Sequence, residues 1–207
     1  MTQTIFEFLF ASVLLTISPG PDIIYVLIIS IRKGFRSGFL LSSGLVSGII
    51  VHVSLVAFGI SALIKASPNL YLGIKFFGAA YLIYLAYNVY KSPAEIDLKY
   101  ADNRQKKGNL FTQGFIMNVL NPKVTLFFLA FFPSFLWDLN HNKIVQFYIL
   151  GFGFMLQAII IFGLVAYLCQ YLYNYLKKHP RSGIVLKYLQ VVVFVSIAIF
   201  ILLDHEY

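Results

Sequence analysis

One acidic and one basic residue lie inside long apolar stretches of the sequence, each directly after a proline. Asp22 ends the sequence Ser-Pro-Gly-Pro-Asp, and Lys123 ends the sequence Asn-Pro-Lys. A charge in apolar surroundings is costly unless it has a partner, so these side chains are the first candidates for binding. A carboxylate suits an ammonium group and a lysine suits a carboxylate, so the pair could bind a zwitterion. A salt bridge that closes a pathway is the alternative, and the two roles are compatible.

The prolines beside these charges indicate two interrupted helices. Ser18 and Asn121 are residue types that cap helices, and the proline after each suits the first position of a new helix. Where a helix restarts, its free backbone N–H groups and its dipole favour negative charge. Matched breaks in two halves of a chain are typical of a secondary transporter's substrate site. The candidate substrate-binding residues are Asp22, Lys123, Asn121, Asn118, Pro19, Gly20, Pro21 and Pro122.

The composition requires lipid as the solvent for most of the chain. Of the 207 residues, 59% are hydrophobic and only 12% are charged, whereas a soluble chain is about half apolar and about a quarter charged. The single cysteine, Cys169, excludes a disulfide within the chain and any Cys-x-x-Cys motif. The net charge of +8 comes from short basic clusters between apolar runs, a pattern typical of membrane topology rather than of nucleic-acid binding.

Six segments are long and apolar enough for transmembrane helices, each of which needs roughly 20 residues. A polar linker over residues 91–111 divides them into two groups of three. We therefore expect an all-α membrane protein with one polytopic domain, residues 1–207. Its halves, residues 1–90 and 112–207, are expected to be inverted three-helix repeats with helices 1 and 4 broken at mid-membrane. The predicted spans are Ile5–Ile31, Phe39–Ile64, Leu70–Tyr90, Thr112–Leu136, Ile144–Leu176 and Ile184–Leu203.

The basic residues predict an orientation for these spans. Of the 16 Lys and Arg residues, three follow the first span, five follow the third and four follow the fifth. Lys65, Lys75 and Lys143 fall on the opposite side. The positive-inside rule therefore places the three basic loops in the cytoplasm and both termini on the periplasmic or extracellular side.

Other polar or small residues at membrane depth have open roles. Asn118 and Asn121 are three residues apart and share a stripe on the fourth span, which could line a cavity or bond neighbouring helices. On the second span, Gly44 and Gly48 share a face with His52. We expect these glycines to permit close helix packing. His52 is a candidate proton carrier, because histidine titrates near neutrality, or else a neutral side chain bonded to another helix.

Several motifs, in this order along the chain, resemble the signatures of the LysE/RhtB family of amino-acid exporters. The resemblance covers nearly the whole chain and implies a bacterial inner-membrane exporter with six helices. It also implies substrates such as lysine, threonine, homoserine, leucine or cysteine, expelled with the proton or electrical gradient. The motifs are Ser18–Asp22, Gly34–Gly38 with Gly44, Lys75–Leu85, and Asn121–Lys123 with the phenylalanine-rich run up to Phe135.

We therefore expect amino-acid efflux by a secondary, alternating-access mechanism, with the zwitterion held between Asp22 and Lys123. Proton exchange is the expected coupling, with Asp22 as the leading candidate carrier. The expected partners are the amino acid, protons, the lipid bilayer and, as an open alternative, a second copy in a homodimer. We expect no cofactor, no metal site and no nucleic acid.

The sequence offers less support for two other classes of function. The first alternative is export of divalent metal ions or another small cation. A site for such an ion needs several carboxylates, thiolates or imidazoles close together. Away from the ends of the predicted spans, only Asp22, His52 and Cys169 offer such groups, and Lys123 would repel a cation. A membrane-embedded enzyme is not expected, because the sequence contains no Gly-x-Ser-x-Gly and no His-Glu-x-x-His motif.

Overall fold

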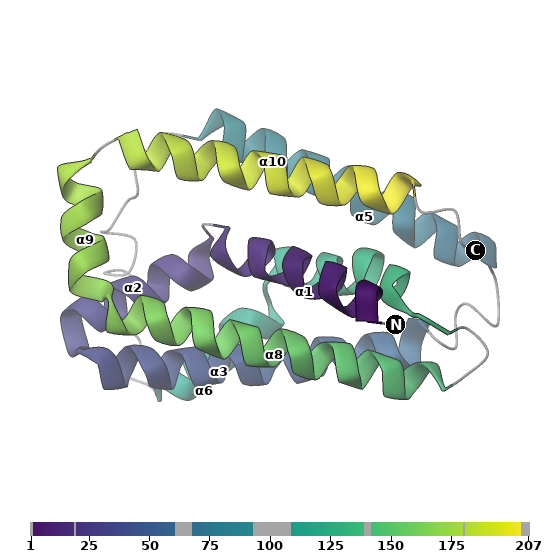
Figure 1. The fold of residues 1–207 in the computed structure, drawn as a ribbon, viewed down its shortest axis with the longest axis horizontal. Helices are drawn as coiled ribbons and strands as arrows, with labels where there is room; N and C mark the ends of the chain where they lie inside the picture. The colour runs from purple at the N-terminus through teal and green to yellow at the C-terminus, as the bar shows by residue number, and fades with distance from the viewer. Residues whose placement is uncertain are drawn as a thin grey trace.

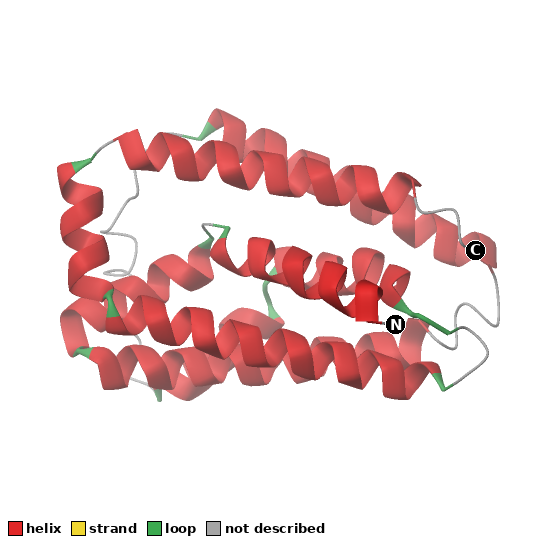
Figure 2. Cartoon of the chain, in the orientation of Figure 1, coloured by secondary structure: helices red, strands yellow, loops and turns green. Residues whose placement is uncertain are grey.

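The computed structural model describes residues 2–18, 20–60, 68–92, 109–138, 142–179 and 181–203, and all the regular structure in these ranges is helical (Figure 2). Pro19, residues 61–64 of the second predicted span and residues 93–108 of the predicted linker lie outside the described residues. The helices are α1 (Thr2–Ile17), α2 (Pro21–Lys33), α3 (Phe35–Ser54), η1 (Leu55–Ile60), α5 (Pro68–Lys91), α6 (Leu110–Val119), α7 (Pro122–Leu126), η2 (Phe127–Phe131), η3 (Phe132–Phe135), α8 (Lys143–Tyr167), α9 (Cys169–Lys178) and α10 (Arg181–Leu203).

Four helical stretches in the described ranges are long and apolar enough to cross a membrane, and six spans result if each of two bent helix pairs counts as one. The bends fall at the two predicted proline breaks. The axis turns by 57° between α1 and α2, and by 48° between α6 and the segment Pro122–Phe135. The predictions of an all-α membrane protein and of two interrupted helices are therefore confirmed.

The predicted fifth span, Ile144–Leu176, was too long. The long helix α8 ends at Tyr167, and after Leu168 the short helix α9 runs in a different direction, across the end of the bundle (Figure 1). A span needs only roughly 20 residues, so the apolar run had length to spare. The α9 sequence Cys-Gln-Tyr-Leu-Tyr-Asn-Tyr-Leu-Lys-Lys has one polar and one apolar face, which suits a membrane surface better than its interior.

The helices form one main bundle and one flanking pair. In the bundle, α3 packs along α6 and α8, and the bent pair of α1 and α2 lies against α8 and α3 (Figure 1). The flanking pair consists of α5 and α10, which lie side by side and contact the bundle mainly through η2. Large apolar side chains such as Phe77 and Phe152 are exposed on outer faces, as contact with lipid requires.

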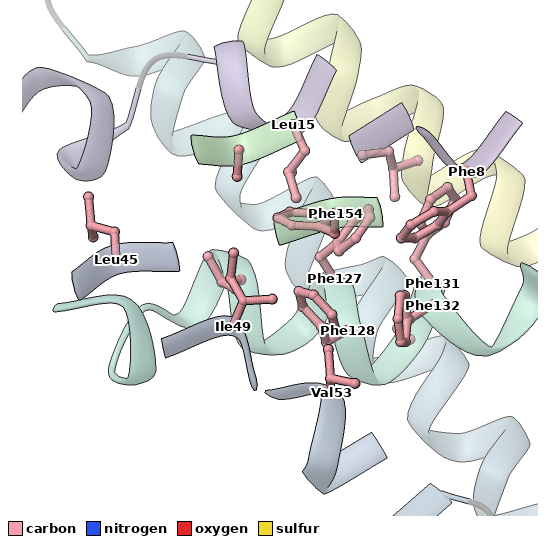
Figure 3. Packing of buried hydrophobic residues seen from close by; sticks show 14 of the residues in the cluster. Phe8, Leu15, Leu45, Ile49, Val53, Phe127, Phe128, Phe131, Phe132 and Phe154 are labelled. Carbon is pink, nitrogen blue, oxygen red and sulfur yellow. The ribbon is translucent and has the colours of Figure 1, made fainter. Parts of the chain in front are cut away.

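Phenylalanine rings fill the core where α1, η2, η3 and α8 meet (Figure 3). The ring centroid of Phe8 lies 5.2 Å from that of Phe132, and the centroid of Phe128 lies 5.2 Å from that of Phe154. Such ring pairs contribute about 0.5–1.5 kcal/mol beyond the area they bury. Because lipid tails are as apolar as the rings, interlocking of this kind is what holds helices together within a membrane.

Glycines bring α3 and α6 into direct backbone contact. A Cβ atom at Gly44 would overlap the carbonyl group of Phe111, and one at Gly114 would overlap the carbonyl of Leu41. A Cβ atom at Gly48 would lie 2.8 Å from the side-chain oxygen of Asn118. The prediction that Gly44 and Gly48 permit close packing is therefore confirmed.

The substitution Gly44→Ala should push α6 away from α3 and destabilise the protein. We expect a loss of about 1–3 kcal/mol, the usual cost of overpacking a tight contact, measured as a lower thermal midpoint in detergent. Gly73→Ala is the matched control, because a Cβ atom there meets nothing within 4 Å. Equal midpoints for the two variants would contradict the close crossing.

Candidate functional site

The two helix breaks meet at one cavity in the interior of the bundle. Its wall comes from the end of α1, the start of α2, the middle of α3, the end of α6, the start of α7 and the middle of α8. The cavity is therefore assembled from both halves of the chain. The lining residues are Leu15, Thr16, Ser18, Gly20, Asp22, Ile23, Ile49, Asn118, Lys123, Val124, Phe154, Ala158 and Phe162.

The cavity is small in this conformation. It offers about 30 Å³ to the centres of water-sized molecules, which is room for about two waters at roughly 10–15 Å³ each. An amino acid is larger than that. The helices around the cavity must therefore part before such a molecule can enter.

The first break follows from the Ser-Pro-Gly-Pro sequence. The backbone N–H of Ser18 still bonds to the carbonyl of Leu14 at 3.0 Å, so α1 keeps its helical pattern to its end. Gly20 is fully extended, with φ −152° and ψ 176°, and Pro21 is the first residue of α2. This short extended step places Asp22 in the first turn of α2, where the helix dipole favours a carboxylate.

The second break is closed by Asn121, whose side chain also reaches the first break. Its Oδ1 accepts a hydrogen bond from the backbone N–H of Lys123 at 3.0 Å, so Asn121 is the N-cap of α7. Its Nδ2 donates to Asp22 Oδ2 at 2.6 Å. One amide therefore caps one restarted helix and binds the carboxylate at the start of the other.

The Lys123 ammonium binds the carboxyl-terminal end of α1. Its Nζ donates to the backbone carbonyls of Leu15 and Ser18, at 3.0 and 3.1 Å. A cation suits this end because the last carbonyls of a helix are unpaired and carry partial negative charge. No direct ion pair joins Asp22 and Lys123, both of which the structure describes, although both line the cavity. The salt bridge that the sequence left open is not formed in this conformation.

Three of the lining residues carry a buried oxygen that receives no hydrogen bond from the protein. They are Ser18 Oγ, Asp22 Oδ1 and Asn118 Oδ1. Two of these atoms can only accept, and the serine hydroxyl can accept or donate. Since most buried polar atoms in proteins are paired, three unpaired ones at one cavity favour a ligand that carries hydrogen-bond donors.

The structure brings most of the predicted site residues together. Asp22, Lys123, Asn118 and Gly20 line the cavity, and Asn121 contacts Asp22 from just behind it. The other four predicted residues do not line the cavity in the structure as described. Pro21 and Pro122 begin helices, and Pro19 lies outside the described residues. The ring of His52 lies behind the lining and bonds to the backbone carbonyl of Asn118.

Sequence reasoning missed the part of the wall that carries no charge. Phe154, Ala158 and Phe162 recur every four residues on α8, but this spacing is the same as that of any buried helix face. Thr16 was missed as well. Its hydroxyl accepts a hydrogen bond from Gln157 Nε2 at 3.0 Å, which ties α8 to the end of α1.

The described residues offer no site for a metal ion. Among them, no group of three or more His, Cys, Asp or Glu side chains is arranged to hold one. The Lys123 ammonium at the cavity also disfavours a cation there. No observation therefore favours the metal-export alternative.

Comparison with known proteins places the chain in a family of translocators. Residues 13–205 match the family described as LysE type translocator. A homoserine/homoserine lactone efflux protein of Salmonella typhi is 32% identical over 172 residues, 83% of each chain, and one of Salmonella typhimurium is 31% identical over the same length. An uncharacterized membrane protein of Pseudomonas aeruginosa is 33% identical over 126 residues, 56% of each chain. No solved structure matches. The chain belongs to the family of LysE type translocators, which are membrane transporters and not enzymes.

Proposed function

We propose that this chain exports a small zwitterionic amino acid with an uncharged side chain across the bacterial inner membrane. The observation that carries the proposal is the cavity between the two helix breaks, which combines Asp22, Lys123 and three unpaired buried oxygens. The substrate's ammonium group would bind Asp22 Oδ1 and Asn118 Oδ1. Its carboxylate would bind Lys123, whose ammonium has three donors and uses two of them on backbone carbonyls.

The uncharged side chain follows from the remainder of the cavity wall. Beyond Asp22 and Lys123, the lining contains no charged group. A lysine-like or glutamate-like side chain would therefore leave its charge buried without a partner, which is costly. The names of the two Salmonella relatives support homoserine as the first substrate to test.

The proposed mechanism is alternating access, coupled to proton exchange. The halves 1–90 and 112–207 would act as inverted repeats that tilt about the two breaks and open the cavity to one side at a time. Protonation of Asp22 would neutralise its charge when the substrate's ammonium leaves, so Asp22 is the leading proton carrier and His52 the alternative. By the positive-inside rule, both termini would be periplasmic.

Efflux from proteoliposomes tests the proposed function directly. Vesicles loaded with labelled homoserine or threonine should show counterflow at least roughly tenfold faster than vesicles loaded with lysine or glutamate. Burying an unpaired charge costs more free energy than the roughly 1.4 kcal/mol that corresponds to a tenfold loss of affinity. Counterflow with none of these amino acids would overturn the proposal. A preference for lysine would contradict the uncharged subsite.

Replacing Asp22 by asparagine should reduce efflux roughly 10- to 100-fold, the usual effect of losing a hydrogen bond to a charged group. The amide keeps the size of the side chain, so membrane insertion should be unchanged. Glu7→Gln is the matched control, because Glu7 is exposed and bonds only to Gln3 in its own turn. Efflux should be measured per inserted protein, and a normal rate for Asp22→Asn would remove this residue from the site.

Replacing Lys123 by methionine should also reduce efflux roughly 10-fold or more. The variant loses the ammonium group that binds the end of α1 and that would bind the substrate's carboxylate. Lys143→Met, at the start of α8, is the control and should transport normally. The double variant Asp22→Lys/Lys123→Asp should stay inactive, because an aspartate at position 123 would face the carbonyls of Leu15 and Ser18. Restored efflux in the double variant would favour a gating salt bridge instead.

A further inference from the structure

His52 lies behind the cavity wall, on α3. Its side chain is 2% exposed, and its ring stacks on Phe128 with centroids 5.7 Å apart and planes tilted by 22°. Its Nε2 lies 3.2 Å from the backbone carbonyl oxygen of Asn118. A carbonyl only accepts, so Nε2 carries a hydrogen and donates it. A neutral imidazole is sufficient for this bond.

The carbonyl that His52 binds belongs to the last turn of α6, directly before the second break. The same oxygen accepts the backbone N–H of Asn121 at 2.9 Å. That turn orients Asn121, which caps α7 and donates to Asp22. The carbonyl oxygen of Asn118 has two lone pairs, so it can accept from Asn121 and from His52 together. His52 therefore adds a bond from α3 to a turn that the chain itself has already closed.

Gly48, one turn earlier on α3, contacts the side chain of the same asparagine. A Cβ atom at Gly48 would lie 2.8 Å from Asn118 Oδ1 and 2.9 Å from Asn118 Cβ, so a larger residue would displace this side chain. The helix α3 therefore contacts Asn118 at two points, through His52 at the main chain and through Gly48 at the side chain. Asn118 is also one of the residues that line the cavity, and its side-chain oxygen has no hydrogen-bond partner in the protein.

We propose that His52 is a positioning residue for substrate recognition. Together with Gly48 it fixes Asn118, so that the Asn118 side-chain oxygen is held at the cavity for a donor group of the substrate and Asn121 stays on Asp22. The role needs a fixed N–H group and no change of protonation at His52. This inference rests on the proposed function, because it assigns the Asn118 oxygen to the substrate.

Two substitutions at His52 separate positioning from proton transfer. His52→Phe keeps an aromatic ring beside Phe128 and removes the donor, whereas His52→Gln keeps an N–H donor and removes the titratable group. We expect His52→Phe to raise the KM for efflux roughly five- to twentyfold, the effect of one lost buried hydrogen bond, with a smaller change in kcat. His52→Gln should keep KM within roughly twofold and the pH profile of efflux unchanged.

Further variants identify the group through which His52 acts. Asn118→Ala should raise KM as much as His52→Phe does, and the double variant should add little, because residues that act through one contact are not additive. Ser54→Ala is the matched control on α3. It removes a 2.8 Å bond to Tyr148 of α8, away from the cavity, and should leave KM unchanged.

The outcomes of this experiment decide the proposal. A wild-type KM for His52→Phe would overturn it, as would a changed pH profile in His52→Gln. If His52→Phe does not fold, His52→Leu, which also removes the donor, takes its place against His52→Gln, and a wild-type KM for it would overturn the proposal. Failure of the wild-type protein to transport any amino acid is a separate result, which would overturn the proposed function and this inference with it.

Discussion

Lipid offers neither donors nor acceptors, so the free backbone groups at the two helix breaks must find partners within the protein. Side chains bind the backbone at three of the four broken ends, whereas the start of α2 has no side-chain cap. Lys123 of α7 binds the last carbonyls of α1, and Asn121 caps α7 while it binds Asp22 of α2. His52 of α3 binds a carbonyl at the end of α6. The polar groups that cap the breaks are thus the same groups that line or border the cavity, and structure and binding cannot be separated at this point of the fold.

The capping side chains are held at the helix breaks because the surrounding helices pack closely. Glycines allow backbone contact between α3 and α6, and Gly48 leaves room for the side chain of Asn118. Interlocked phenylalanine rings join α1 to η3 and η2 to α8 beside the cavity. The segment η2 is a π-helix, whose backbone hydrogen bonds span one residue more than those of an α-helix, and such turns are often found beside functional sites. The glycine contacts and the phenylalanine rings limit how far a helix break can move without the helices around it. Opening of the cavity is therefore expected to involve whole helices.

The site keeps some of its polar groups unused while others hold the helix ends. In the conformation described here, the Lys123 ammonium rests on backbone carbonyls and one oxygen of Asp22 rests on Asn121, while the second oxygen has no partner. A substrate with an ammonium and a carboxylate group would satisfy the groups left over without displacing the caps. A weak and exchangeable site of this kind suits a transporter, which must release what it binds. The cavity is too small in this conformation for such a substrate, so binding would require the surrounding helices to move.

The sequence alone determined the membrane environment, the positions of the two helix breaks and the two charged residues beside them. Each of these follows from local features: the length of an apolar run, a proline, or a charged residue within such a run. The predicted end of the fifth span was wrong because the tyrosines and leucines after Leu168 were counted into the span, although Gln170, Asn174 and two lysines give that segment a polar face. The sequence did not reveal the partners of Lys123 and His52. Both bind main-chain carbonyls, and a carbonyl is present at every residue, so no side-chain pattern marks the one that is used. The tertiary structure alone decided that choice, by bringing the ends of two broken helices to the same place.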